Sequence, residues 1–355
     1  MIYARAQMIL AVITILAALF MGGCHPVPSV SPYISSGQVN YDNRAYEQAI
    51  TDYSKAIELD PKVSEAYIGR GNAYYQKSKY DEALADFKKA VDLKPGSAEA
   101  LTGRGKCYTM KKQYDLALAD LTEATKINPN FSEAYARLGT YYRQQKDPDL
   151  AKSLANYNKA IELDGKDGRY YAWRANYFCM LKDYESGLSD YNKAFELTPV
   201  ISASWYNNRG WIRIMAGKYD GALSDINKAL ELDPNGAYVW DTRGWYYYLT
   251  GNTAQALADI NKALDLDATD GTIFGHRGIC YYTTKEYDRA MADLNKAIEM
   301  DGKNAEAFLY RGLCYKIFGQ PDKAIADFQS AANFSYDDAI KKQAMDEITN
   351  LRYAE

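Results

Sequence analysis

The sequence predicts an all-α fold, a solenoid of about nine helical hairpins that ends in a capping helix. Two observations lead to this prediction. Alanine recurs at intervals of 34 to 36 residues, and each interval holds two stretches of apolar residues at helical spacing. A self-similar period of this length is typical of a repeat array. The alanine series comprises Ala56, Ala90, Ala124, Ala160, Ala194, Ala229, Ala263, Ala297 and Ala331.

The segment 64–96 shows what one repeat contains. Apolar and small residues follow helical spacing through its first half and again from Tyr80 to Leu93, with the polar stretch QKSK between them. Pro95 and Gly96 end the second helix, because proline cannot continue a helix and glycine suits the turn. Helices of about a dozen residues are marginal alone in water. We therefore expect each hairpin to depend on its neighbours for stability.

Small residues recur at one position of the first helix. Glycine inside a helix is destabilising by roughly 1 kcal/mol relative to alanine, so the column needs a steric reason. Bulky residues such as Phe87 and Ile260 form a matching column in the second helix, and we expect the two helices to cross closely there. The column comprises Gly37, Gly71, Gly105, Gly139, Ala175, Gly210, Gly244, Gly278 and Gly312.

These columns resemble the tetratricopeptide repeat family. The shared elements are the period of 34, an RG-x-x-Y segment in the first helix, a Y-x-x-A-x-x-D-[YFIL]-x-x-A segment in the second and a closing L-D-P. The resemblance implies a right-handed superhelix of hairpins with a concave groove lined by the first helices. We expect nine repeats over residues 31–336 and a C-terminal capping helix over 337–355. The turn around QQKDPDL in the fourth repeat is longer than the others.

An arginine precedes the small-residue column in seven repeats, and an aspartate follows it sixteen residues later. The fourth repeat has Leu138 and Asn156 instead, so both charges are lost together, which favours an ion pair within each hairpin. The alternative is an arginine track for anionic ligands. The predicted structural pairs are Arg70–Asp86, Arg104–Asp120, Arg174–Asp190, Arg209–Asp225, Arg243–Asp259, Arg277–Asp293 and Arg311–Asp327.

Residues 1–23 do not belong to the repeats. Arg5, the apolar run 8–21 and the small residues before Cys24 fit a secretory signal, and the run is short for a membrane-spanning helix. The segment MGGC resembles a bacterial lipoprotein processing site, which implies lipid attachment at Cys24 and a tether over 24–30. An uncleaved membrane anchor and ordinary secretion are the alternatives. By analogy with lipoprotein sorting, the residue after Cys24 indicates the outer membrane of the bacterial cell envelope, facing the periplasm.

The composition offers little for catalysis. The chain has a formal net charge of −4, two histidines and no basic cluster, so we expect no nucleic-acid partner, metal or cofactor. Carboxylates recur in every repeat, whereas the paired carboxylates of a hydrolase would occur once. We therefore expect that the protein is not an enzyme, and that its four cysteines after Cys24 are thiols.

Ligands of the family commonly bind in the groove of the first helices. In repeats six to nine the corresponding positions are apolar and aromatic, whereas in repeats two to four they are mostly polar. We expect the later repeats to hold a hydrophobic peptide segment or a partner helix. The alternative is that these side chains pack between repeats. The candidates are Trp211, Met215, Trp245, Tyr248, Tyr282, Leu313 and Ile317.

The sequence predicts a non-catalytic protein–protein interaction scaffold or adaptor, anchored to the envelope through its lipid. The alternative is a periplasmic carrier or chaperone-like module that holds exported polypeptides in the concave groove. The two differ in stoichiometry, because a scaffold forms a discrete complex and a carrier binds many unfolded chains weakly.

Overall fold

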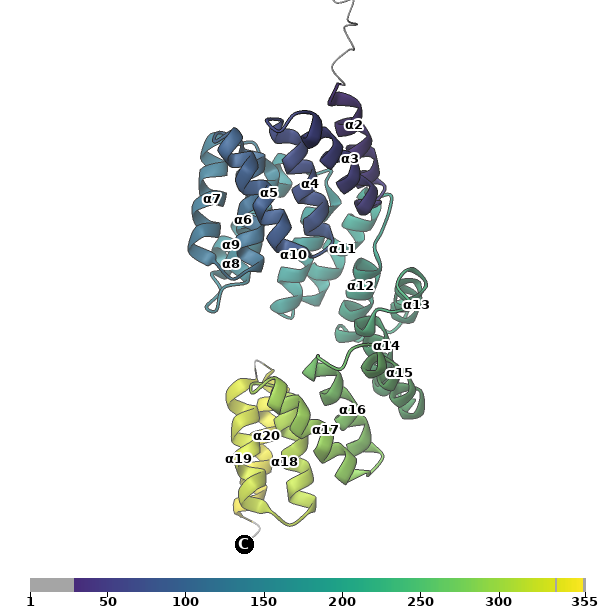
Figure 1. Cartoon of the computed structure of the whole chain (residues 1–355). Helices are drawn as coiled ribbons and strands as arrows, with labels where there is room; N and C mark the ends of the chain where they lie inside the picture. The colour runs from purple at the N-terminus through teal and green to yellow at the C-terminus, as the bar shows by residue number, and fades with distance from the viewer. Residues whose placement is uncertain (1–28, 336, 354–355) are drawn as a thin grey trace, which may run out of the picture. The chain divides into compact units, whose positions relative to one another are not determined.

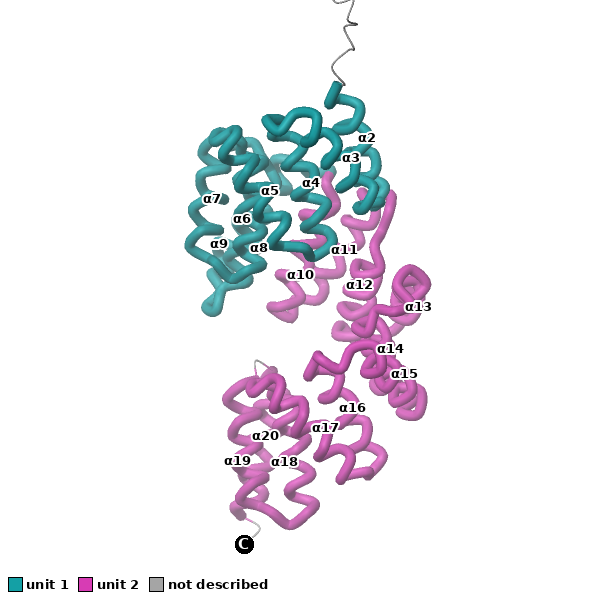
Figure 2. Tube along the Cα trace, viewed as in Figure 1, with its two compact units in different colours: residues 1–166 teal, residues 167–355 magenta. Residues whose placement is uncertain are grey.

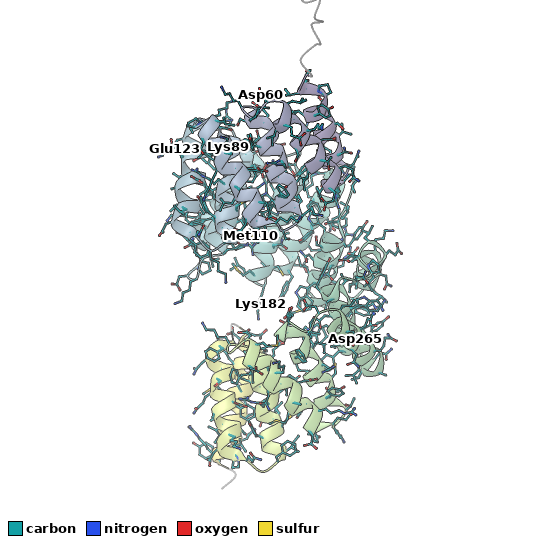
Figure 3. The ribbon with its side chains drawn as sticks, in the orientation of Figure 1. Asp60, Lys89, Met110, Glu123, Lys182 and Asp265 are labelled. Carbon is teal, nitrogen blue, oxygen red and sulfur yellow. The ribbon has the colours of Figure 1, made fainter. Side chains whose placement is uncertain are left out.

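A computed structural model describes residues 29–335 and 337–353. Within these residues the chain forms helices joined by short turns and contains no β-strand, which confirms the all-α prediction (Figure 1). The chain divides into two compact units, residues 1–166 and 167–355 (Figure 2). Charged side chains such as Lys89, Glu123 and Asp265 extend outward from second helices (Figure 3).

Unit 1 holds four hairpins in its described part, and the two helices of each hairpin lie against one another. Within the unit, each hairpin also contacts the next one along the chain. The hairpins are α2/α3 (Ser31–Asp42 and Tyr46–Leu59), α4/α5 (Ser64–Gln76 and Tyr80–Leu93), α6/α7 (Ala98–Met110 and Tyr114–Ile127) and α8/α9 (Ser132–Arg143 and Leu150–Leu163).

Unit 2 repeats the arrangement with five hairpins and a final helix in its described part. These elements are α10/α11 (Gly168–Met180 and Tyr184–Leu197), α12/α13 (Ala203–Met215 and Ala222–Leu232), α14/α15 (Ala237–Leu249 and Thr253–Leu266), α16/α17 (Gly271–Thr283 and Tyr287–Met300), α18/α19 (Ala305–Ile317 and Pro321–Phe334) and α20 (Asp338–Arg352).

Apart from Gly221 in α12/α13, the turn inside the hairpin contains one residue with a left-handed backbone in eight of the nine described hairpins. It lies two residues after the first helix ends, where a positive φ reverses the chain. Glycine adopts this conformation without steric penalty, but five of the eight positions hold other residues. Hairpin α8/α9, with its longer turn, has no such residue among those described. The eight are Arg44, Ser78, Lys112, Lys182, Gly217, Gly251, Lys285 and Gly319.

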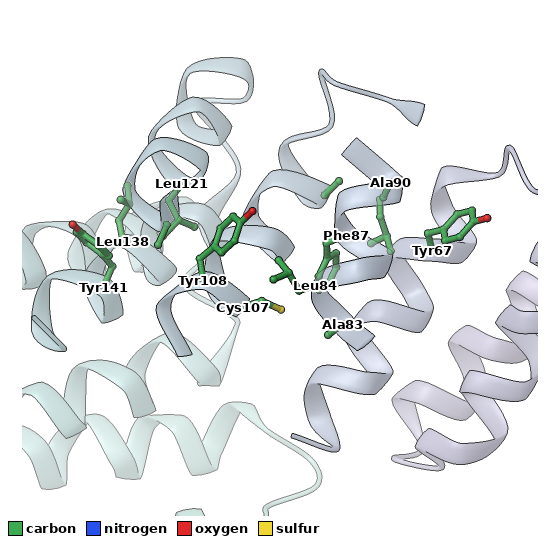
Figure 4. Close-up of a cluster of buried hydrophobic side chains, with 13 residues drawn as sticks. Tyr67, Ala83, Leu84, Phe87, Ala90, Cys107, Tyr108, Leu121, Leu138 and Tyr141 are labelled. Carbon is green, nitrogen blue, oxygen red and sulfur yellow. The ribbon is translucent and has the colours of Figure 1, made fainter. Parts of the chain in front are cut away.

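The core runs between the two helices of each hairpin and between successive hairpins. In unit 1, Tyr67, Phe87 and Leu121 belong to one continuous cluster of buried side chains (Figure 4). The small-residue column borders this core. A methyl group added at Gly105 would lie 2.8 Å from Leu121 Cγ, and one added at Gly71 would lie 3.1 Å from Phe87 Cζ. The glycines therefore make room for bulky side chains of the second helix, as the sequence predicted.

Hairpin α12/α13 departs from the regular pattern in a way that the sequence analysis did not foresee. Helix α13 begins only at Ala222, because Gly221 before it has a left-handed backbone (φ 77°). The guanidinium of Arg213 fills the space beside it and donates a 2.9 Å hydrogen bond from Nη1 to the carbonyl of Gly221. A side chain at position 221 would collide with this guanidinium.

Helix α20 covers the last hairpin. Ala344 and Ile348 are buried against a cluster that includes Phe308 and Phe328. The carboxylate of Asp337 accepts a 2.8 Å hydrogen bond from the backbone N–H of Ala339 and so caps the start of the helix. This packing is what a capping helix requires.

Candidate functional site

The arginine and aspartate columns meet inside the hairpins. In all seven predicted pairs the arginine binds the aspartate in a bidentate way, with Nε 2.6–2.8 Å from Oδ2 and Nη2 2.7–3.0 Å from Oδ1. The seven aspartates are buried. Nε and Nη2 of each arginine are occupied by its own aspartate, whose charge also balances that of the guanidinium. The ladder therefore holds hairpin register and does not act as an arginine track for anionic ligands.

The remaining guanidinium nitrogen reaches the preceding hairpin in at least five of these pairs. Nη1 of Arg277 donates to Asn261 Oδ1 at 2.8 Å, and Nη1 of Arg311 donates to Asn295 Oδ1 at 2.8 Å. One arginine therefore ties together three helices. The other three contacts are Arg70 to Ser54, Arg209 to Asn192 and Arg243 to Asn227.

Two hairpins lack the pair. In α2/α3 the carboxylate of Asp52 accepts hydrogen bonds from Ser36 Oγ at 2.7 Å and Asn40 Nδ2 at 2.8 Å instead. In α8/α9, where the sequence has Leu138 and Asn156, the Asn156 amide donates to its own helix. Among the described residues, the Asp52 carboxylate thus accepts hydrogen bonds from neutral side chains in place of a guanidinium.

We define the first-helix face of unit 2 by the seven predicted candidates, which lie on α12, α14, α16 and α18. These first helices contact one another in chain order. The face has an exposed part and a buried part. Met215 and Ile317 expose 37% and 46% of their surface, whereas Trp211, Tyr248 and Tyr282 are half-buried and Trp245 and Leu313 are buried. Leu249, one position after Tyr248, adds a further exposed apolar side chain.

Trp245 lies in the floor of this face. Its ring stacks on the imidazole of His276 at a centroid distance of 4.2 Å and on the Tyr248 ring at 4.9 Å. Only 8% of Trp245 is exposed. For Trp245 and Leu313 the structure therefore favours the packing interpretation, and a ligand would meet their exposed neighbours first.

The hydrogen bond between His276 and Asp241 was not predicted from the sequence. His276 is buried, and its Nδ1 lies 2.9 Å and 3.0 Å from the two carboxylate oxygens of Asp241. Burial alone would lower the pKa of His276, but the charge of Asp241 and its hydrogen bond outweigh burial and raise it. The two residues are 35 apart, so they lie on successive first helices. The only sequence signal was their near-repeat spacing.

The corresponding face of unit 1 is polar and largely satisfied by its own groups. The buried ammonium of Lys106 donates to Asn72 Oδ1 at 2.5 Å and lies 4.7 Å above the Tyr75 ring. Arg137 lies over the same ring and pairs with Glu133 at 3.0 Å. The cavity beside these residues has a volume of about 10 Å³, room for about one water molecule.

The described residues offer little else for chemistry or membrane insertion. No group of three or more histidine, cysteine or acidic side chains in 29–335 and 337–353 is arranged to hold a metal ion. Over the same part of the chain, no helix combines the length and the apolarity that crossing a membrane requires. Burial raises the pKa of Cys107, Cys280 and Cys314 to about 12. Cys24, the predicted lipid-attachment residue, lies outside the described residues.

Sequence comparison identifies the repeats. Four profiles described as tetratricopeptide repeat match the chain. No curated protein matches it significantly. The matched residues are 36–98, 70–130, 132–167, 203–235, 242–305 and 294–326.

One solved structure in particular supports the fold. A chain of the APC/C hetero-tetramer Cut9-Hcn1 superposes with a TM-score of 0.66 at 14% identity, over 89% of this chain and 74% of that one. A tetratricopeptide repeat protein from Parabacteroides merdae gives 0.48 at 20% identity, over 71% and 98%. Yeast Tom70 gives 0.47 at 14% identity, over 92% and 96%. With the repeat profiles, the bidentate ladder and the stacked hairpins in agreement, this chain belongs to the tetratricopeptide repeat family.

Proposed function

We propose that this protein is a non-catalytic interaction scaffold, held at the bacterial cell envelope by a lipid on Cys24, and that the first-helix face of unit 2 is its docking surface. Tetratricopeptide repeats are a fold for binding other proteins or peptides. The observation that carries the choice of face is the row formed by Met215, Leu249 and Ile317. These exposed apolar side chains occupy equivalent positions of α12, α14 and α18, and Thr283 occupies that position of α16.

The contrast between the two units supports this choice. In unit 1 the equivalent face is built mostly from charged and amide side chains that bind one another, and Met110 is its exposed apolar residue at the position of the row. In unit 2 the exposed row lies beside the half-buried rings of Trp211, Tyr248 and Tyr282. Aromatic side chains with an exposed edge are common anchors of protein interfaces, and a contiguous apolar patch on a soluble repeat is typical of a partner surface.

The proposal assigns no reaction to the chain. The repeated aspartates are bound by arginines, and the three buried thiols have raised pKa values, so neither set supplies a general base or a nucleophile. What the face can do is bury a partner's apolar side chains against its own.

Site-specific photo-crosslinking tests the docking surface. A photoreactive phenylalanine analogue would replace Met215, Leu249 or Ile317, which are exposed, so the fold should tolerate it. We expect one discrete adduct from intact cells at all three positions. A broad smear of adducts would indicate a carrier for many polypeptides, and no adduct at any of them would contradict the docking surface.

Matched controls lie on the second helices of the same unit. Lys228, Asp265 and Glu299 are also exposed, but they lie on α13, α15 and α17, away from the first-helix face. The analogue at these positions should give no adduct. In addition, Met215→Glu and Ile317→Glu should reduce the adduct formed from Leu249, because each places a charge where the partner's apolar surface would lie.

Metabolic labelling with an alkynyl fatty acid tests the anchor. The wild-type chain should take up the label and stay with membranes, because acyl chains supply the hydrophobic attachment. Cys24→Ser should lose both, whereas Cys179→Ser should lose neither. Label retained by Cys24→Ser would refute lipid attachment at that residue.

A further inference from the structure

We propose that His276 is a pH-dependent switch in the first-helix face of unit 2. Its imidazolium, held by Asp241, keeps Trp245 in the buried floor of the face, and loss of the proton releases Trp245 from that position. The regulatory consequence rests on the proposed docking function, but the switch itself is a property of the isolated chain.

Side chains from three successive first helices, α12, α14 and α16, meet at the His276 imidazole. His276 of α16 is only 5% exposed and bonds through Nδ1 to both oxygens of Asp241 on α14. One turn further along α14, the Trp245 ring lies almost parallel to the imidazole, with an interplanar angle of 21°. Trp211 of α12 approaches the same imidazole at 6.4 Å.

The charges around the imidazole are negative. Asp241 faces it from α14, Glu306 from α18 and Asp270 from the residue that caps α16, while α12 contributes the Trp211 ring. Desolvation is the largest single influence and opposes the charged form. The charge and hydrogen bond of Asp241, together with the charges of Glu306 and Asp270, outweigh it, so the pKa of His276 is raised. This environment therefore favours the protonated imidazole more than water does.

Protonation changes what holds Trp245. An imidazolium attracts the electron-rich face of an indole, and it also neutralises the buried carboxylate of Asp241. A neutral imidazole does neither, so the carboxylate is left buried with a weaker partner. Trp245 also stacks on Tyr248, whose neighbour Leu249 belongs to the exposed row. Movement of Trp245 would therefore change the surface that a partner meets.

The sign of the effect follows from the raised pKa. A histidine that is easier to protonate in the folded state contributes stability that is complete below its unfolded pKa of about 6.5, and loses it as the pH rises through the folded value. The switch thus holds Trp245 while His276 is protonated and releases it as the pH rises through the folded-state pKa of His276, which lies above the ordinary value.

Two NMR titrations on the full-length chain in detergent test the switch. The sequence contains two histidines, His25 and His276, so the imidazole spectrum is simple, and His25→Gln assigns it. Incorporation of 5-fluorotryptophan gives one signal for each of five tryptophans, and Trp245→Phe assigns the relevant one. We expect the Trp245 fluorine signal to shift with the same midpoint as the His276 imidazole, and that midpoint to lie above about 6.5.

Variants separate the switch from general changes of the fold. Asp241→Asn should lower the midpoint of His276, and His276→Gln should leave the Trp245 signal independent of pH. His25→Gln should change neither. A Trp245 signal that does not move while His276 titrates would overturn the proposal, as would a His276 midpoint at or below the ordinary value. If either substitution unfolds the chain, the wild-type titrations alone still decide, because both midpoints are read in one molecule.

The result of these titrations does not depend on whether the proposed docking surface binds a partner. These readouts need no partner, whereas the crosslinking from Met215, Leu249 and Ile317 needs no titration. Matching midpoints without any adduct would leave the switch standing and contradict the docking function. Adducts with unmatched midpoints would support the docking function and contradict the switch.

Discussion

Arg243 and Asp259 form a bidentate ion pair across hairpin α14/α15, with Nε 2.6 Å from Oδ2 and Nη2 3.0 Å from Oδ1. The third nitrogen, Nη1, lies 3.2 Å from Asn227 Oδ1 of the preceding hairpin. Asp259 is buried. The pair therefore combines a contact within a repeat with a contact between repeats, and its energetics can be separated by mutation.

We expect Arg243→Met to destabilise the protein by about 3 kcal/mol, because it leaves the Asp259 carboxylate buried without its counter-charge. Adding Asp259→Leu should recover part of this loss. A double-mutant cycle in urea gives the coupling free energy, which we expect to be on the order of 2 kcal/mol. The exposed pair Arg289–Glu286 is the matched control, with coupling below about 1 kcal/mol. Equal coupling in both cycles would contradict a buried, register-holding pair.

Hairpin α2/α3 offers the converse experiment. Asp52 lacks the arginine of the other ladder positions, and a cavity of about 250 Å³ lined by Ser36, Asn40 and Asp52, among others, lies beside it. Ser36→Arg should complete the ladder and stabilise the protein by up to about 1 kcal/mol, because the site is more exposed than the other seven. The gain should disappear in Ser36→Arg with Asp52→Asn. A gain that persists there would show that the arginine acts in another way.

The glycine column makes a separate prediction. Gly278→Ala would place a methyl group 2.8 Å from Leu294 Cγ, and we expect a loss of about 1–3 kcal/mol although alanine favours the helix. Gly302→Ala is the control. Its nearest neighbour would be the Ile298 carbonyl at 4.0 Å, so the change should be neutral or slightly stabilising. Thermal melts compare the two, and similar midpoints would argue against close crossing at the column.

Thiol reactivity tests the burial of the cysteine column. The pKa of Cys107, Cys280 and Cys314 is raised to about 12, with burial as the main cause. At pH 8 only on the order of one in ten thousand of each is thiolate, so a disulfide reagent should leave these three unmodified in the native protein. The reagent should modify them in urea. Rapid modification without denaturant, located by mass spectrometry, would show that the column is open.

Contacts that follow the repeat period were predictable from the sequence. The joint loss of both charges at Leu138 and Asn156 was enough to pair the arginine and aspartate columns, because a hairpin brings positions sixteen residues apart together in every copy. The close approach of Phe87 to Gly71 followed from the same logic. Seven arginine–aspartate pairs carried the first inference, and a column of nine small residues carried the second.

Contacts that occur once were not predictable in this way. The pairing of His276 with Asp241 and the stacking on Trp245 depend on how neighbouring hairpins are rotated, which periodicity alone does not determine. The left-handed turn residue was also not predictable, because its identity varies between Lys, Ser, Arg and Gly while its φ angle stays positive. Arg213 was missed because Gly221 shortens α13 and lets a second arginine reach Asp225.

The gap in the ladder at α8/α9 has a consequence for how the array comes apart. The melting of a repeat array depends on the stability of each repeat and on the contacts between neighbours, and this hairpin lacks the ion pair that joins the two helices of its counterparts from α4/α5 onward. We therefore expect heat or mechanical tension to open α8/α9 before the hairpins that contain the pair. The N-terminal hairpins and the C-terminal ones would behave as two cooperative blocks, each able to refold after the other has opened.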